Sequence, residues 1–396
     1  MGTRDSARHH ASMRIRENGS TPRPRGRSNG HRDVVTFAVG DAGAPEGHEA
    51  STRAEIARRL AVLAGFEFAG EYDPGSRYEA QPYFVPSDTL TIADATNLRI
   101  DDAHDLFGGV VPAAVAATKA ITHPLVDDDA HAPEGWSPAF ARLVAEAVLP
   151  GFSAYACKDA LRAGRILLER GPVRVKLATG VAGLGQWVAH DAAELCAIIA
   201  AIDVGEIAHA GVVVEQNLTD VATRSVGHVE AAGFEATYCG EQSQTTNNAG
   251  VEVYGGSALR VVRGGFDALL SLDLAPDMRL AIAQARAYDD AAGACFHGFF
   301  ASRRNYDVAQ GSDARGQRRS GVLEQSWRLG GASGAEIAAL EAFRADPSLR
   351  SVGAISREIY GESPSVPEHA AVYFRGIDPD VGALTKFTMI ERHADA

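Results

Sequence analysis

Several features that would place the chain in a common class are missing from its 396 residues. No apolar run approaches the roughly eighteen residues that span a bilayer, and the N-terminus lacks the apolar segment of a secretory signal. The formal net charge of −13 argues against an extended nucleic-acid surface, because contacts to phosphate backbones need clustered lysine and arginine. We therefore expect a soluble, cytoplasmic protein that binds neither membranes nor nucleic acid.

Cysteine and lysine are scarce, four of each. The cysteines form no CxxC pair and no Cys/His spacing typical of zinc, which fits reduced thiols in a cytoplasm. The chain also shows no Ser/His/Asp or Cys/His signature of a protein nucleophile. The residues concerned are Cys157, Cys196, Cys239 and Cys295, and Lys119, Lys158, Lys176 and Lys386.

The overall proportions predict a globular protein with more than one lobe. Hydrophobic residues make up 45% and charged residues 22% of the chain, which is enough for a buried core. A chain of this length usually exceeds one compact core, so we expect two or three lobes with a cleft between them. Residues 1–33 are the exception, because they combine many arginines with almost no aliphatic side chains. They predict a disordered basic tail, with a nucleic-acid arm or a targeting peptide as the alternative.

The remaining pattern predicts an α+β fold in successive lobes. A buried strand at residues 34–39 is followed by a helix with Thr52 and Glu55 at capping-box spacing, which is a β-α start. The acidic stretch 127–129 reads as a linker. The expected lobes are residues 34–126 (small α/β), 136–214, 215–345 and, as a C-terminal extension without assignable chemistry, 346–396.

The later part of the chain predicts a large antiparallel component. Short β-like runs alternate with polar turns between residues 226 and 262, and residues 242–248 are expected to form a surface loop, with a contact to ligand as the alternative. A long helix is predicted over about 278–294. Another helix is predicted with Ser333 and Glu336 as its capping residues.

A glycine-rich segment after Lys176 is the first candidate for ligand chemistry. The lysine lies on a predicted strand, and Gly180, Gly183 and Gly185 occupy a loop that leads to a second short strand. Glycines let backbone amides approach phosphate oxygens, and the ammonium offsets their charge. A Walker A loop differs, because its lysine follows the glycines and opens a helix. An ordinary glycine-rich hairpin is the alternative.

Polar residues also gather at the ends of later strands. One apolar strand ends in Glu215, Gln216, Asn217 and Leu218, where backbone groups can face the edge of an adenine ring. Two later strands carry Asp307 and Glu324, and Arg328 follows four residues after Glu324. Two carboxylates and an arginine can gather Mg²⁺ and a transferring phosphoryl group. Salt-bridged strand residues would give the same pattern.

In this order the elements resemble the ATP-grasp superfamily, whose members include biotin carboxylase and the D-alanine and glutathione ligases. The resemblance covers roughly residues 110–340 and implies the ATP-grasp fold, in which two α+β lobes clamp ATP behind a small α/β lobe. It implies that Lys176 contacts the α- and β-phosphates and that the glycine loop closes over the β- and γ-phosphates. It further implies that residues 215–218 face adenine, that Asp307 and Glu324 hold Mg²⁺, and that Arg328 steadies an acyl phosphate or the developing anion.

The chain departs from the family's pattern at two positions. The last acidic strand of the family usually reads Glu-x-Asn-x-Arg, whereas here Ser326 stands in place of the asparagine and is a poorer metal ligand. Asp220 is the nearest candidate for the ribose hydroxyls, at an unusual spacing. For the second phosphate lysine of the family the candidates are Lys119 and Lys158. Two histidines, His123 and His297, are expected to be structural rather than general bases.

The leading interpretation is an ATP-dependent ligase that activates a carboxylate as an acyl phosphate for attack by an amine or a similar nucleophile, using Mg-ATP. Its partners would be small-molecule substrates, and a homodimer is compatible with the sequence. One alternative is a nucleotide-binding regulatory protein without turnover, which Ser326 motivates. Another is a biotin-carboxylase-like enzyme, although the chain has no Met-Lys-Met biotinyl segment. A Rossmann-type dehydrogenase is disfavoured, because Asp-Ala-Gly-Ala and not G-x-G-x-x-G follows the first strand.

Overall fold

The computed structural model describes residues 32–40, 47–180, 184–362 and 364–391. Most of the predicted basic tail therefore lies outside the described residues. Its last two residues do not belong to a tail, because Arg32 forms an ion pair with Asp105 and Asp33 begins the first strand.

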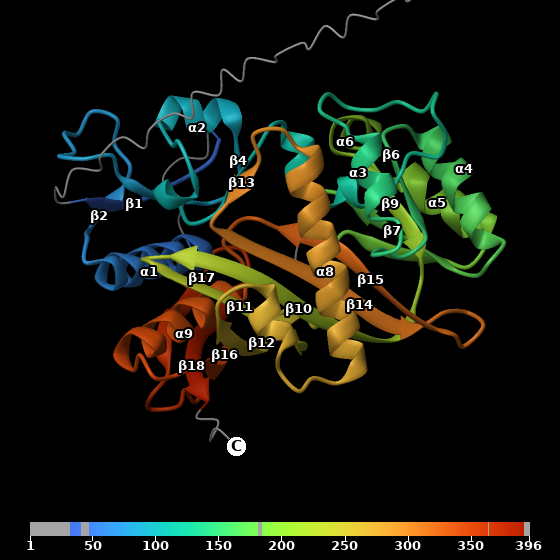
Figure 1. Ribbon diagram of the computed structural model, residues 1–396. Helices are drawn as coiled ribbons and strands as arrows, with labels where there is room; N and C mark the ends of the chain where they lie inside the picture. Colours follow the sequence, from blue (N-terminus) through green and yellow to red (C-terminus); the bar gives the residue numbers. More distant parts are fainter. Residues whose placement is uncertain (1–31, 41–46, 181–183, 363, 392–396) are drawn as a thin grey trace, which may run out of the picture. The chain divides into compact units, whose positions relative to one another are not determined.

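The described strands form four sheets, and the mixture of parallel and antiparallel sheets with helices confirms the predicted α+β class. Two N-terminal sheets have three strands each, in the orders β2-β1-β3 and β13-β5-β4. A small antiparallel sheet has the order β6-β9-β7-β8. A large antiparallel sheet has the order β15-β14-β10-β11-β12-β16-β18-β17 (Figure 1).

The N-terminal part is built from short strands and two helices. Its elements are β1 (Asp33–Phe37), α1 (His48–Ala64), β2 (Glu67–Glu71), β3 (Tyr83–Pro86), β4 (Leu90–Thr91), α2 (Ile92–Leu98), β5 (Gly109–Val111) and, from later in the chain, β13 (Phe300–Ala301). The predicted capping box at Thr52 and Glu55 is wrong. Helix α1 begins earlier, after Gly47, and the Thr52 hydroxyl instead donates to the carbonyl of His48 inside the helix.

The small sheet carries helices on one side. Its elements are β6 (Gly151–Ala154), α4 (Cys157–Leu168), β7 (Val173–Leu177), β8 (Gln186–Ala189), α5 (Ala192–Ala201), α6 (Val204–Ala210) and β9 (Val212–Gln216), whereas the preceding helix α3 (Pro138–Leu143) packs against Tyr288 of the long helix α8 (Pro276–Cys295). Small residues of α4, Ala160 and Ala163, pack against Leu195 and Ile199 of α5 and against the sheet. Asp191 caps α5, because its carboxylate accepts hydrogen bonds from two backbone N–H groups of the first turn.

The large sheet is more continuous than the sequence suggests. Its strands are β10 (Thr219–Ala231), β11 (Phe234–Thr246), β12 (Glu252–Arg263), β14 (Arg303–Ser312), β15 (Arg318–Ser326), β16 (Ser351–Tyr360), β17 (Ala371–Asp378) and β18 (Gly382–Glu391). The short runs expected between residues 226 and 262 are long strands. The loop expected at 242–248 is wrong, since Gln242 to Thr246 belong to β11. The C-terminal strands β16, β18 and β17 complete one edge of this sheet.

Helices cover both faces of the large sheet. The helices are α7 (Phe266–Leu270), α8 (Pro276–Cys295) and α9 (Ser333–Ala345). The long helix α8, predicted from the sequence, lies over β14 and β15 (Figure 1) and packs on Val308 and Val322, whereas α1 and α9 pack on the other face against Leu259 and Ala354. No helix in the described part of the chain is long and apolar enough to cross a membrane.

Candidate functional site

The hairpin that joins β7 to β8 depends on its glycines. Lys176 of β7 pairs with Gln186 of β8, and the Leu177 N–H donates to the carbonyl of Gly185 at 2.9 Å. A Cβ on Gly180 would lie 2.5 Å from the carbonyl oxygen of Leu184, and Gly185 has a φ of +70°. Two of the three predicted glycines are therefore required by backbone geometry. The third, Gly183, lies outside the described residues.

Lys176 forms a buried ion pair with the glutamate at the end of β9. Its Nζ lies 2.5 Å from Glu215 Oε1, and His123 Nε2 lies 3.2 Å from Glu215 Oε2. Burial by itself raises the pKa of Glu215, but the Lys176 ammonium and the His123 hydrogen bond outweigh it and lower the pKa to about 2. The predicted phosphate lysine and the predicted adenine-side glutamate thus lie together. His123 is buried against them, as expected of a structural histidine, whereas His297 is exposed.

The segment after Glu215 leads from the small sheet to the large one. The backbone N–H groups of Gln216 and Asn217 donate to the carbonyls of Pro150 and Pro172, at 2.8 and 3.0 Å. The next residue, Leu218, packs in a small apolar cluster with Leu149 and Ala309.

Asp220 stands apart from the other predicted residues. It is exposed near the start of β10, has a φ of +50°, and has no side-chain partner among the described residues. Its proposed contact with ribose rests on the sequence alone.

Two carboxylates face each other on the large sheet. Asp307 of β14 lies directly opposite Glu324 of β15. Burial first, and then the charge of Glu324, raise the pKa of Asp307 to about 6. Its Oδ1 accepts hydrogen bonds from Gln242 at 2.7 Å and Asn305 at 2.8 Å. Asn305 was not singled out from the sequence, although it lies two residues before Asp307 and so on the same strand face.

Lys119 connects this carboxylate pair to the glycine hairpin. It begins a short 3₁₀ turn over Lys119–Thr122, and its Nζ lies 2.7 Å from both Glu324 Oε2 and the carbonyl oxygen of Gly180. The competing candidate, Lys158, is exposed on α4. Of the two lysines, Lys119 is therefore the one beside the other candidate residues.

Ser326 and Arg328 lie at the end of β15 and just beyond it. A guanidinium nitrogen of Arg303 donates to Ser326 Oγ at 3.2 Å and also to the carbonyls of Ser326 and Arg328. The ATP-grasp pattern places Arg328 on the last acidic strand, but β15 ends at Ser326. The Arg328 Nε lies 3.3 Å from Asp88 Oδ1.

Arg303 was missed because its partner was misassigned. Glu336 does not cap α9, which has no side-chain cap. Instead it is fully buried and pairs with Arg303 at 2.7 Å, and it also accepts a hydrogen bond from the Tyr238 hydroxyl. The motif Ser-x-x-Glu fits a capping box equally well, so nothing in the local sequence separates the two arrangements.

The carboxylate pair fits a magnesium ion that is also held by another ligand. In the described residues no three His, Cys, Asp or Glu side chains gather as a metal site. Mg²⁺ commonly takes one or two carboxylates and completes its shell with phosphate oxygens and water. Asp307 and Glu324 provide this donor set, whereas the Ser326 hydroxyl already accepts a hydrogen bond from Arg303.

Comparison with known proteins identifies a family and a set of similar structures. A family described as protein of unknown function (DUF3182) matches residues 36–388. None of the curated proteins matches the sequence.

Solved structures similar to the chain include three enzymes from different bacteria. N5-carboxyaminoimidazole synthetase from Staphylococcus aureus, complexed with ADP, is 13% identical, covers 91% of this chain and 93% of its own, and has a TM-score of 0.46. Phosphoribosylamine–glycine ligase from Thermotoga maritima is 13% identical, covers 91% and 92%, and has a TM-score of 0.48. Biotin carboxylase from Campylobacter jejuni is 10% identical, covers 90% and 87%, and has a TM-score of 0.49.

Proposed function

The chain belongs to the DUF3182 family of proteins of unknown function, and we propose that it is an ATP-dependent ligase of the ATP-grasp kind. The reaction would activate a carboxylate as an acyl phosphate for attack by an amine or a similar nucleophile. One observation carries the proposal: Lys119 contacts both the hairpin carbonyl of Gly180 and Glu324, which faces Asp307. A phosphate-binding loop, a lysine and a metal-binding carboxylate pair must adjoin one another if all three act on one triphosphate.

The two lysines would bind different parts of the triphosphate. Lys176 has one ion-pair partner within the described ranges, Glu215, so its ammonium retains donors for a phosphate oxygen. The β7–β8 hairpin would offer backbone N–H groups to the phosphates. Lys119 lies on the side of the hairpin nearer the carboxylates and would contact the terminal phosphates. A bound Mg²⁺ would neutralise phosphate charge, and Asp307 and Glu324 are the residues that would hold it.

The proposed chemistry needs no nucleophile from the protein. The substrate carboxylate would attack the γ-phosphorus, ADP would leave, and the incoming nucleophile would then displace phosphate from the acyl carbon. The protein would position the reactants and compensate their charges, which is what buried and ion-paired lysines beside a carboxylate pair can do. Arg328, next to Asp88, would be available to a substrate anion from the N-terminal side.

Isothermal titration with Mg-ATP tests the binding step. Wild-type protein should bind, Lys176→Met should bind at least tenfold more weakly, and Lys158→Met, which removes an exposed lysine, should bind like wild type. Circular dichroism would verify that each variant is folded. No binding by the wild type, or equal binding by all three proteins, would refute the proposal.

Ser326 supports a second candidate, a nucleotide-binding regulatory protein without turnover. Its hydroxyl stands where the ATP-grasp pattern has the amide that binds metal, and it already accepts a hydrogen bond from Arg303. ADP release measured across a broad panel of acids and amines separates the two functions. Tight Mg-ATP binding with no ADP release from any pair would favour the regulatory protein, whereas release that depends on one acid and one nucleophile would favour the ligase.

A further inference from the structure

A pocket lies beside Gln216, where the chain passes from the small sheet to the large sheet, and apart from Gln216 its lining residues have no role in the proposed ligase reaction. It has a volume of about 360 Å³, within the usual range for small-molecule sites. Three arginines contribute to its wall, one just after α4, one in the β14–β15 turn and one near the start of β15. The lining residues are Pro150, Arg170, Gln216, Asp313, Arg315 and Arg319.

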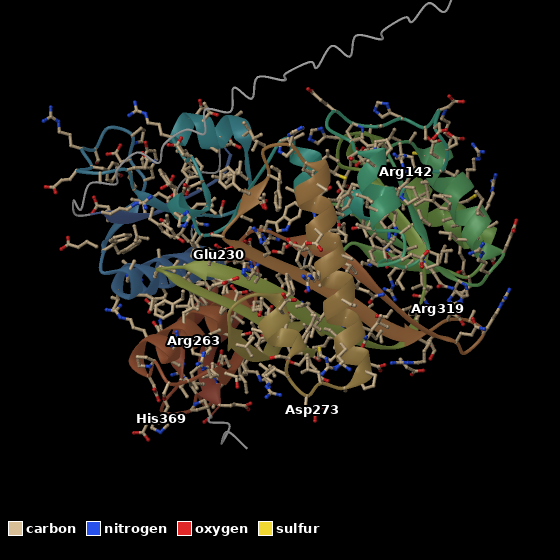
Figure 2. All side chains as sticks on the ribbon, viewed as in Figure 1. Arg142, Glu230, Arg263, Asp273, Arg319 and His369 are labelled. Atoms are coloured by element: carbon tan, nitrogen blue, oxygen red, sulfur yellow. The ribbon has the colours of Figure 1, made fainter. Side chains whose placement is uncertain are left out.

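Two of these arginines have no counter-charge. Arg319 is paired, since its Nε lies 2.9 Å from Asp313 Oδ2 and its side chain also donates to Gln317. By contrast, the guanidinium groups of Arg170 and Arg315 have no hydrogen-bond or ion-pair partner among the described residues. Among the described residues of the wall, the one carboxylate, that of Asp313, is already paired with Arg319, which leaves a net positive pocket. Figure 2 shows Arg319 at the outer end of the β14–β15 hairpin.

Gln216 adds a buried acceptor to this positive wall. Its side-chain Oε1 is inaccessible to solvent and has no hydrogen-bond partner within the described part of the chain. An unsatisfied buried amide oxygen costs about 1–3 kcal/mol, so such a group usually marks a place for a donor. A ligand that placed negative charge on the arginines, and toward which the Gln216 side chain turned its Oε1 to accept a hydroxyl or N–H, would satisfy both features.

The pocket is separate from the proposed triphosphate site. Successive side chains of a strand point to opposite faces, and Glu215 points to Lys176, so Gln216 points away from them. Asp313 follows Asp307 by six residues of extended chain, which is roughly 20 Å at about 3.3 Å per residue. A molecule in the pocket therefore cannot be the nucleotide phosphates bound at Asp307.

We propose that this pocket binds a small polyvalent oxyanion that also carries a hydrogen-bond donor, with Arg170 and Arg315 on the anion and Gln216 on the donor. Arginine forks match phosphate and carboxylate oxygens equally well, so both chemistries are compatible. Monohydrogen phosphate has a proton to donate, whereas sulfate at neutral pH has none. The ligand would touch the small sheet through Gln216 and the hairpin that carries Asp307 and Glu324 through Arg315.

Calorimetric titration with inorganic phosphate tests the site on the full chain. Wild type should bind phosphate more tightly than sulfate, and Arg170→Gln/Arg315→Gln should lose at least tenfold in phosphate affinity. The control Arg165→Gln/Arg260→Gln removes the same charge from exposed arginines outside the pocket and should bind like wild type. Citrate, which has carboxylates and a hydroxyl, tests the alternative ligand chemistry.

Two further variants locate the phosphate and its donor contact. Gln216→Leu should abolish the preference for phosphate over sulfate. Lys119→Gln reports on phosphate bound at the triphosphate site, and the phosphate binding that depends on Arg170 and Arg315 should persist in it. Failure of both phosphate and citrate to bind wild type, or equal losses in the two double variants, would overturn the proposal. So would a loss in Lys119→Gln without a loss in the pocket variant, since phosphate would then occupy the triphosphate site. None of these outcomes depends on whether the protein turns over ATP.

Discussion

Two lysine–glutamate pairs lie near the glycine hairpin, and they differ in their surroundings. In the first, the side chains of Lys176 and Glu215 are only 6% and 2% exposed, and His123 closes the other side of the carboxylate. In the second, Lys119 is 8% exposed but Glu324 is 35% exposed and faces a second carboxylate, Asp307.

The difference indicates different roles for similar ion pairs. Two buried charges cannot exchange partners without a large cost in free energy, because either charge left alone would be desolvated and without a counter-charge. Lys176 and Glu215, which we call the sealed pair, therefore hold β7 against β9 and fix the ammonium in place. Lys119 and Glu324, which we call the open pair, have an alternative, since a cation or a phosphate can compete for Glu324 or for Lys119. We therefore assign positioning to the first pair and exchange with ligand to the second, and the following experiments test that assignment.

The largest expected effect is on stability. Glu215→Gln would leave the Lys176 ammonium buried without a counter-charge and should lower the free energy of unfolding by about 3–5 kcal/mol. Glu324→Gln changes a partly exposed pair and should lower it by at most about 1 kcal/mol. Urea denaturation monitored by circular dichroism measures both. Equal losses in the two variants would contradict the contrast between a sealed and an open pair.

Acid should act on the sealed pair. The pKa of Glu215 is about 2 in the folded protein and 4.5 ordinarily, so it is lowered on folding. A lowered carboxyl pKa contributes stability that is present above pH 4.5 and is lost as the pH falls towards 2, about 3 kcal/mol in all. Denaturation at a series of pH values should show this loss in wild type and a smaller one in Glu215→Gln. A wild-type profile that is flat between pH 4.5 and 2 would show that the pair contributes no such term.

Much of the sealed pair was accessible from the sequence, because strand periodicity and the glycine spacing identified Lys176 and the strand that ends in Glu215. The open pair was not, since no local pattern reports that Lys119 meets Glu324 from another part of the chain. Gln242 was misassigned because its polar run looks like a loop, although polar residues suit a strand whose face lines a site. The overall α+β class and helix α8 follow from hydrophobic periodicity, whereas strand order depends on long-range pairing that periodicity does not contain.

Turnover should depend on Glu324, the carboxylate of the open pair, and not on an exposed glutamate elsewhere on the sheet. If the proposed ligase activity is present, Glu324→Gln should lower kcat by about 100-fold, equivalent to about 2.7 kcal/mol, with little change in Mg-ATP affinity. Glu241→Gln replaces an exposed glutamate of the same sheet and should have no effect. Steady-state ADP release measures both. Similar kcat values for Glu324→Gln and wild type would remove this residue from the reaction.

Lys119 should affect nucleotide affinity with little cost in stability. Lys119→Met would remove the ammonium that joins Gly180 to Glu324, and Mg-ATP binding should weaken about tenfold, or about 1.4 kcal/mol. Because Glu324 remains partly exposed, the free energy of unfolding should change by less than about 1 kcal/mol. Calorimetry and urea denaturation give the two numbers. A loss of several kcal/mol in stability with unchanged affinity would make Lys119 a structural residue without a role in nucleotide binding.

The smallest expected effect is the pH dependence of cation binding at Asp307. Its pKa is raised to about 6 from 3.8, so its contribution to stability has the opposite sign to that of Glu215: it is present below pH 3.8 and is lost as the pH rises through 6. A metal ion competes with the proton, and affinity should therefore rise about twofold between pH 6 and 8, as the half-protonated carboxyl becomes fully ionised. Electron paramagnetic resonance of Mn²⁺ binding without nucleotide measures this step. Asp307→Asn should bind more weakly and show no step, whereas the same twofold rise in that variant would place the titrating group elsewhere.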